Sequence, residues 1–269
     1  MREIGRVFQK LKEERSGALI GYIMCGDPKP EHTPKIAQAL VQGGVDILEL
    51  GLPFSDPIAD GPTIQAASVR ALKAGTKPRM VLETAKQIKE EHRIPIAILT
   101  YYNPIFRMGP DTFFRSARDC GVDGVIVPDL PVEEAHDYRK TAETHEIDTI
   151  FLAAPSTSTR RLQKIVKCTS GFLYLVSSLG VTGERMNIQD STIQLIKKFK
   201  PYTAGRIPLA VGFGISTSDH VKAVIENGAD GAIVGSAFVN IVRKNQRNSR
   251  KMLDEIEEKA RDLKTSTKT

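Results

Sequence analysis

The stretch that decides the fold is LELGLPFSDPIADGPTIQ, residues 48–65. Residues 45–50 form a short apolar run typical of a buried strand, and the prolines and glycines after it stop any helix or strand before Thr63. Glu49 lies inside that run, where burying a carboxylate is costly unless the group is paired or used chemically. Asp60 lies near the far end of the loop and is either a functional group or the cap of the next helix.

Apolar runs and helical patterns alternate along the rest of the chain. The predicted strands are residues 18–24, 46–50, 96–101, 124–127, 149–153, 172–177, 209–212 and 232–234. The predicted helices are residues 34–42, 63–74, 79–92, 112–119, 132–145, 159–167, 192–199, 219–227 and 240–263. Strands that alternate with helices and are apolar throughout favour a parallel sheet covered by helices, and the chain length suits a closed (β/α)8 TIM barrel.

The 269 residues show no linker or break in composition, so we expect one domain rather than two. Residues 1–16 are predicted to be an added N-terminal helix whose apolar stripe packs on a neighbour, and residues 265–269 a frayed tail.

Composition excludes several classes of function. The formal charge of +6 is not accompanied by any nucleic-acid-binding motif, and no apolar stretch is long enough to span a membrane. The three cysteines form no pairing motif, which is typical of the reducing cytoplasm. The five histidines fall in or beside predicted helices, so we expect no metal centre. No lysine lies in the predicted strands to form a Schiff base.

In a TIM barrel the reacting groups lie at the carboxyl ends of the strands. Glu49, Asp60, Tyr101, Asp129 and Tyr174 all fall at or near such ends. Independently, Gly212 ends the seventh predicted strand and Gly214 follows it. Gly235-Ser236 follows the eighth strand and opens a helix. Backbone N–H groups in such turns can bind a phosphate, although tight turns alone would also explain the glycines. Residues 178–187 resemble a lid.

Residues 48–62 resemble the signature of the tryptophan synthase alpha chain family nearly position for position. Further matches span most of the chain: Gly26-Asp27-Pro28, Tyr101-Tyr102-Asn103-Pro104, Pro128-Asp129-Leu130-Pro131, Gly180-Val181-Thr182-Gly183, Gly212-Phe213-Gly214-Ile215 and Gly235-Ser236. Met24 and Cys25 stand where many members of the family carry Thr and Leu, and Ser178 stands where some carry a basic residue in the lid. These departures bear on lid closure and on coupling to the partner.

The resemblance implies retro-aldol cleavage of indole-3-glycerol phosphate to indole and glyceraldehyde 3-phosphate, with Glu49 and Asp60 as the catalytic residues. It places substrate binding on Tyr22, Tyr101, Ile126, Tyr174, Thr182 and Phe213, and phosphate binding on Gly183, Gly214, Gly235 and Ser236. It places the partner interface on Pro53, Asp56, Asn103 and Phe106. It also implies an α2β2 heterotetramer with a tryptophan synthase beta chain, with no cofactor in this chain and pyridoxal phosphate only in the partner.

Two other interpretations stay open. The chain can serve mainly as an allosteric ligand-binding subunit that activates the beta chain. It can also be a different phosphate-binding barrel, such as a sugar-phosphate epimerase or isomerase, although no metal-binding histidines support that class.

Overall fold

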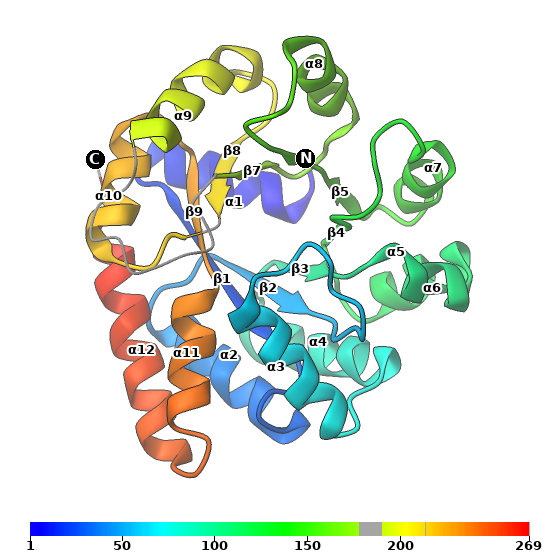
Figure 1. Ribbon diagram of the computed structural model, residues 1–269, viewed down its shortest axis with the longest axis vertical. Helices are drawn as coiled ribbons and strands as arrows, with labels where there is room; N and C mark the ends of the chain where they lie inside the picture. Colours follow the sequence, from blue (N-terminus) through cyan, green and yellow to red (C-terminus); the bar gives the residue numbers. More distant parts are fainter. Residues whose placement is uncertain (178–189, 213, 269) are drawn as a thin grey trace.

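The computed structural model describes residues 1–177, 190–212 and 214–268. Its strands are β1 (Ala18–Met24), β2 (Ile47–Gly51), β3 (Ile96–Leu99), β4 (Gly124–Ile126), β5 (Asp148–Ile150), β6 (Leu152–Ala153), β7 (Leu173–Val176), β8 (Leu209–Gly212) and β9 (Gly231–Val234). Every pairing between these strands is parallel, in the order β5-β4-β3-β2-β1-β9-β8-β7-β6. Figure 1 shows the strands at the centre with the helices around them, so the predicted TIM barrel is confirmed.

The prediction of a single fifth strand over residues 149–153 is wrong in one detail. β5 pairs with β4 and β6 pairs with β7, and only Phe151 separates the two short strands. The backbone carbonyl of Phe151 accepts a hydrogen bond from the Tyr174 N–H at 3.0 Å. The two edges of the sheet therefore meet through one continuous segment, which changes partner at its middle and nearly closes the barrel.

Helices follow the strands around the outside of the barrel. Their bounds are α1 (Glu3–Glu13), η1 (Pro30–His32), α2 (Thr33–Gln42), α3 (Pro62–Lys73), α4 (Pro78–His92), α5 (Tyr102–Met108), α6 (Pro110–Asp119), α7 (His136–Thr144), α8 (Thr159–Cys168), α9 (Asp190–Thr203), α10 (Ser218–Glu226), α11 (Ser236–Lys244) and α12 (Ser249–Thr265). Two differences from the predicted helices have clear local causes.

The predicted closing helix over residues 240–263 is two helices, α11 and α12. Between them the Asn245 side chain bonds the Ile241 carbonyl and Glu255, and the Asn248 side chain caps α12 by accepting the Lys251 N–H. Asparagine side chains that bond local backbone in this way favour a turn over a continuous helix.

The sequence analysis did not predict helix α5. In the structure a side-chain hydrogen bond marks the start of this helix. Asp129 accepts a hydrogen bond from the Tyr102 N–H at 2.9 Å, which satisfies one of the free backbone donors at the start of α5. Asp129, which the sequence analysis placed among the candidate reacting groups, therefore supports the segment that carries Asn103 and Phe106.

Helix α1 seals the end of the barrel at which the strands begin. Ile4, Phe8 and Leu11 are buried in one cluster with interior residues of the strands, such as Ile20 and Ile47. The predicted apolar stripe of the N-terminal helix is thus confirmed, and its neighbour is the barrel interior (Figure 1). A cavity of about 680 Å³ lies on this same side of the barrel, lined in part by Val7, Lys10 and Asp46.

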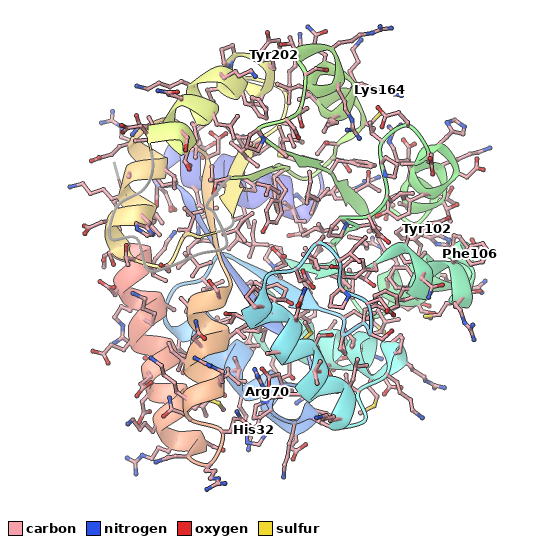
Figure 2. The ribbon with its side chains drawn as sticks, in the orientation of Figure 1. His32, Arg70, Tyr102, Phe106, Lys164 and Tyr202 are labelled. Atoms are coloured by element: carbon pink, nitrogen blue, oxygen red, sulfur yellow. The ribbon has the colours of Figure 1, made fainter. Side chains whose placement is uncertain are left out.

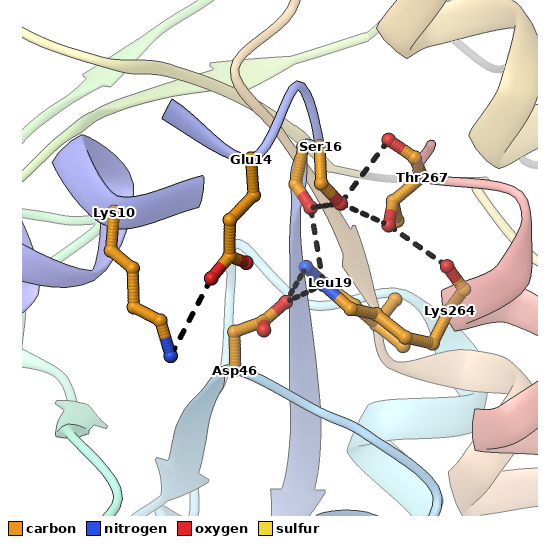
Figure 3. Close-up of polar contacts among 8 residues, drawn as sticks. Lys10, Glu14, Ser16, Leu19, Asp46, Lys264 and Thr267 are labelled. Carbon is orange, nitrogen blue, oxygen red and sulfur yellow. Dashed lines mark hydrogen bonds and ion pairs between the residues drawn. The ribbon is translucent and has the colours of Figure 1, made fainter. Parts of the chain in front are cut away.

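The prediction of a frayed tail is wrong for residues 265–268. The Thr267 residue is fully buried, its carbonyl accepts the Gly17 N–H at 2.8 Å, and Ser16 forms a β-bridge with Lys268. Lys264 donates to Asp46 at 2.7 Å, and the same carboxylate accepts the Leu19 N–H (Figure 3). The tail is therefore fastened to the start of β1. None of the helices in the described ranges combines the length and the apolar character needed to cross a membrane.

Candidate active site

Glu49 lies at the centre of β2, between Tyr22 of β1 and Ala97 of β3 in the register of the sheet. Its side chain is fully buried, and neither carboxyl oxygen has a hydrogen-bond partner among the residues that the structure describes. Burial, and then the nearby charge of Asp60, raise the pKa of Glu49 from 4.5 to about 8. The ion-pair interpretation of Glu49 is wrong within the described ranges, and the group is held mainly protonated at neutral pH.

Asp60 lies at the end of the loop that follows β2, directly before Gly61. Gly61 is the N-cap of α3, with no side-chain hydrogen bond in the cap, so the interpretation of Asp60 as a helix cap is wrong. Burial raises the pKa of Asp60 to about 6, and a hydrogen bond from the Tyr101 hydroxyl partly opposes that rise. Asp60 is therefore mainly ionised at neutral pH, whereas Glu49 is mainly protonated.

Three tyrosines surround the two acids. Tyr22, Tyr101 and Tyr174 are each at most 5% exposed, and burial, followed by the charges of the two acids, raises the pKa values of Tyr22 and Tyr174. The Tyr101 hydroxyl accepts the Ala59 N–H at 3.0 Å and also bonds Asp60. The predicted residues from β1, the segment after β3, and β7 thus meet around the acids.

Ile126 of β4 extends this wall. It is fully buried in the interior cluster that also contains Tyr174 and Ala97. Ile126 and Ala97 therefore give the site an apolar side.

Gly51 and Gly212 make room for the tyrosines, a role that the sequence analysis did not assign to them. A Cβ atom at Gly51 would lie 2.2 Å from the Tyr22 hydroxyl oxygen, and one at Gly212 would lie 2.5 Å from that of Tyr174. Both distances are far below van der Waals contact. The signal was present, because each glycine ends a barrel strand, but the residue it faces depends on the register across strands.

The predicted phosphate site is described only in part. Gly214 has a φ of +87°, Gly235 is the N-cap of α11, and Ser236 is the first residue of that helix. Because β8 and β9 pair side by side, these turns lie at one edge of the barrel mouth. A Cβ at Gly235 would be 3.2 Å from the Tyr22 ring, so this turn borders the acids. Thr182, Gly183 and Phe213 lie outside the described residues, as does the predicted lid.

The predicted partner interface is mostly exposed. Asp56 and Asn103 are exposed, and Phe106 is 66% exposed at the periphery of the molecule (Figure 2). Ile58, which the sequence analysis did not single out, is 82% exposed in the same loop as Asp56. Pro53 is buried, so it shapes the loop rather than offering a surface in this structure.

Comparisons with known proteins bear on this geometry. A family model described as "Tryptophan synthase alpha chain" matches residues 8–268. The chain belongs to the tryptophan synthase alpha chain family. A relative from Methanosarcina barkeri, named tryptophan synthase alpha chain, is 47% identical over 99% of this chain and 97% of its own length.

Solved structures agree. The tryptophan synthase alpha chain from Legionella pneumophila superposes with a TM-score of 0.90 at 34% identity, covering 99% of this chain and 97% of that chain. A structure of the tryptophan synthase a2b2 complex from Pyrococcus furiosus gives a TM-score of 0.87 at 41% identity, covering 93% and 98%. The family places the chain among the lyases of tryptophan biosynthesis.

Proposed function

We propose that this chain cleaves indole-3-glycerol phosphate to indole and glyceraldehyde 3-phosphate, with Glu49 and Asp60 as its catalytic residues. The observation that carries the proposal is the fully buried Glu49 carboxyl, unpaired among the described residues and close enough to Asp60 for the aspartate charge to raise its pKa. A buried acid that is still protonated at neutral pH is suited to deliver a proton.

The carbon–carbon bond to the indole ring cannot break directly, because an indole carbanion is a poor leaving group. Protonated Glu49 gives its proton to C3 of the ring, which converts the ring into an electron-accepting cation. The resulting Glu49 carboxylate then takes the proton of the neighbouring side-chain hydroxyl. The C–C electron pair returns to the ring as the aldehyde forms, so Glu49 ends protonated and the proton count balances. This general acid–base role accounts for about 10²–10⁴-fold in rate.

Asp60 stabilises the positive charge that develops on the ring when Glu49 donates its proton. Its carboxylate accepts a hydrogen bond from the ring N–H, where positive charge develops after protonation at C3. Such preorganised electrostatic stabilisation contributes about 3 kcal/mol. The hydrogen bond from Tyr101 lowers the pKa of Asp60 and so favours its ionised form. The family resemblance assigns substrate binding to Tyr22, Tyr101, Ile126, Tyr174, Thr182 and Phe213. It assigns phosphate binding to Gly183, Gly214, Gly235 and Ser236.

In the same proposal, the indole that this chain releases passes to a partner, the beta chain. The exposed Asp56, Asn103 and Phe106 would face a beta chain in an α2β2 heterotetramer, and pyridoxal phosphate would belong to that partner alone. The similar Pyrococcus furiosus chain belongs to an a2b2 complex described as mutually activated, which supports this assembly.

The test is indole release from indole-3-glycerol phosphate by the purified chain, alone and with a beta chain added. Release by the chain alone that rises with the partner supports both the reaction and the coupling. Release only with the partner would favour the activating-subunit interpretation. A folded chain that releases no indole in either case would refute the proposal.

A further inference from the structure

Helix α3 begins two residues after Asp60 and lies beside the loop that follows β2 (Figure 1). Three of its side chains form hydrogen bonds with that loop or with the segment after β1. The first is Gln65, whose side-chain amide donates to the Asp60 carbonyl at 2.9 Å and to the Pro57 carbonyl at 3.4 Å. Gln65 is exposed, yet its amide is directed at two loop carbonyls. The backbone of Asp60 is thereby tied to the first turn of α3.

The second side chain is Ser68, which holds the beginning of the same loop. Its hydroxyl donates to the Phe54 carbonyl at 2.8 Å and accepts the Phe54 N–H at 2.9 Å. A serine inside a helix commonly bonds the carbonyl one turn earlier. Ser68 is only 1% exposed, and both hydrogen bonds of its hydroxyl are with the loop. Ser68 therefore satisfies both backbone groups of Phe54, as a neighbouring strand would.

Phe54 in turn connects this contact to Asp60. Its ring stacks on the Tyr101 ring with centroids 5.2 Å apart, and the Tyr101 hydroxyl bonds both the Ala59 N–H and the Asp60 side chain. A shift of Phe54 would move Tyr101, and Tyr101 holds Asp60. The two ends of the loop are thus coupled through one aromatic pair.

Helix α3 is itself fixed to the barrel. Arg70 (Figure 2) forms two hydrogen bonds of 2.7 Å with the carboxylate of Asp27. Asp27 follows β1 and is only 2% exposed. Ala67 and Ala71 are fully buried in a cluster with Tyr22. Because a bidentate ion pair fixes orientation as well as distance, α3 is a rigid support for the loop.

We propose that Gln65 and Ser68 are positioning residues for the reaction, which hold Asp60 in its catalytic orientation from the rigid surface of α3. The inference rests on the proposed function of Asp60 and extends it to side chains that do not touch the substrate. A catalytic carboxylate displaced by about 1 Å can lose about 10²-fold in rate, so the loss of one tether is expected to be smaller but measurable.

The experiment measures kcat and KM for indole release in Gln65→Ala and Ser68→Ala. We expect kcat to fall about tenfold while KM changes less than about threefold, because the tethers act on the transition state through Asp60. The matched controls lie on α4: Gln87→Ala removes an amide that bonds Glu91 at 3.0 Å, and Thr84→Ala removes a hydroxyl that bonds its own helix at 2.8 Å. Both controls are expected to keep wild-type kcat.

Repeating the substitutions in an Asp60→Asn background separates positioning from general loosening of the fold. If the tethers act through Asp60, Gln65→Ala and Ser68→Ala lower kcat in the wild-type chain but not in Asp60→Asn. Equal losses in both backgrounds, or unchanged kcat in the wild-type background, would overturn the proposal. If Ser68→Ala does not fold, the exposed Gln65 decides the question alone.

A failure of the proposed function is recognised separately. It would appear as a wild-type chain without cleavage, or as an Asp60→Asn variant with wild-type rates, and both proposals then fall. A wild-type chain that cleaves, with Asp60→Asn impaired and the tethers without effect, overturns only the positioning role.

Discussion

Replacing Glu49 by glutamine should change both the activity of the chain and the way its stability depends on pH. The amide has nearly the same shape but carries no titratable proton. Turnover should fall by about 10²–10⁴-fold, since the amide can neither deliver nor remove a proton. The effect on stability follows from the pKa of the buried carboxyl.

The pKa of Glu49 is 4.5 in an unfolded chain and about 8 in the folded one. Between these values the folded state holds a proton that the unfolded state has released, so the wild-type free energy of unfolding falls as pH rises and is constant above about pH 8. At about 1.36 kcal/mol per pH unit the whole interval corresponds to about 5 kcal/mol, and the part from about pH 5.5 to about pH 8 to about 3 kcal/mol. Glu49→Gln removes this dependence.

The assay compares urea unfolding of wild type and Glu49→Gln at about pH 5.5 and about pH 8, reading midpoints at matched slopes. From about pH 5.5 to about pH 8, the free energy of unfolding of the variant should rise by about 3 kcal/mol relative to that of wild type. Glu90→Gln on α4, which changes an exposed carboxylate, is the matched control. Parallel pH dependence in wild type and Glu49→Gln would show that Glu49 is already ionised in the folded chain, and its role as proton donor would be refuted.

Two further predictions concern the same acids and the room beside them. Because the proposed mechanism needs Glu49 protonated and Asp60 ionised, kcat/KM should rise through about pH 6 and fall through about pH 8. A profile that is flat from about pH 5 to about pH 9 would contradict these roles. Gly51→Ala would place a Cβ 2.2 Å from the Tyr22 hydroxyl oxygen and should cost about 1–3 kcal/mol in urea unfolding together with most of the indole release. Gly61→Ala, where a Cβ meets nothing within 4 Å, is the control for stability, and equal unfolding midpoints in the two variants would refute the packing argument.

The alternation of apolar runs and helical patterns was sufficient to predict the barrel, because a strand buried on both faces has a distinctive composition. The predicted number of strands is wrong at Phe151. One predicted strand is two short strands there, of which the first pairs with β4 and the second with β7. Which neighbour a strand pairs with depends on the curvature of the closing barrel. A pattern read along one segment does not contain that information.

Glu49 and Asp60 were identified from their places near a strand end. The sequence nevertheless left a purely structural role open for each, as an ion-pair partner for Glu49 and as a helix cap for Asp60. The structure decides both: Glu49 has no partner among the described residues, and the cap of α3 is Gly61. The contacts of Ser68 and Gln65 with the loop were not predicted. They join side chains to backbone groups across a turn, and their geometry exists only once α3 is packed against β1.

The two acids illustrate why the fold tolerates an interior carboxyl that has no hydrogen-bond partner among the described residues. A protonated Glu49 is neutral, so at neutral pH most of the cost of burying charge is avoided, whereas pairing it with a cation would hold it ionised and unable to donate. Helix α1 seals the opposite end of the barrel with Ile4, Phe8 and Leu11, which limits the water that would otherwise lower the pKa of Glu49. Asp60 lies in a more open loop and is hydrogen-bonded by Tyr101, which favours its ionised form. Environments that separate the pKa values of two neighbouring acids assign one as proton donor and the other as the stabiliser of positive charge.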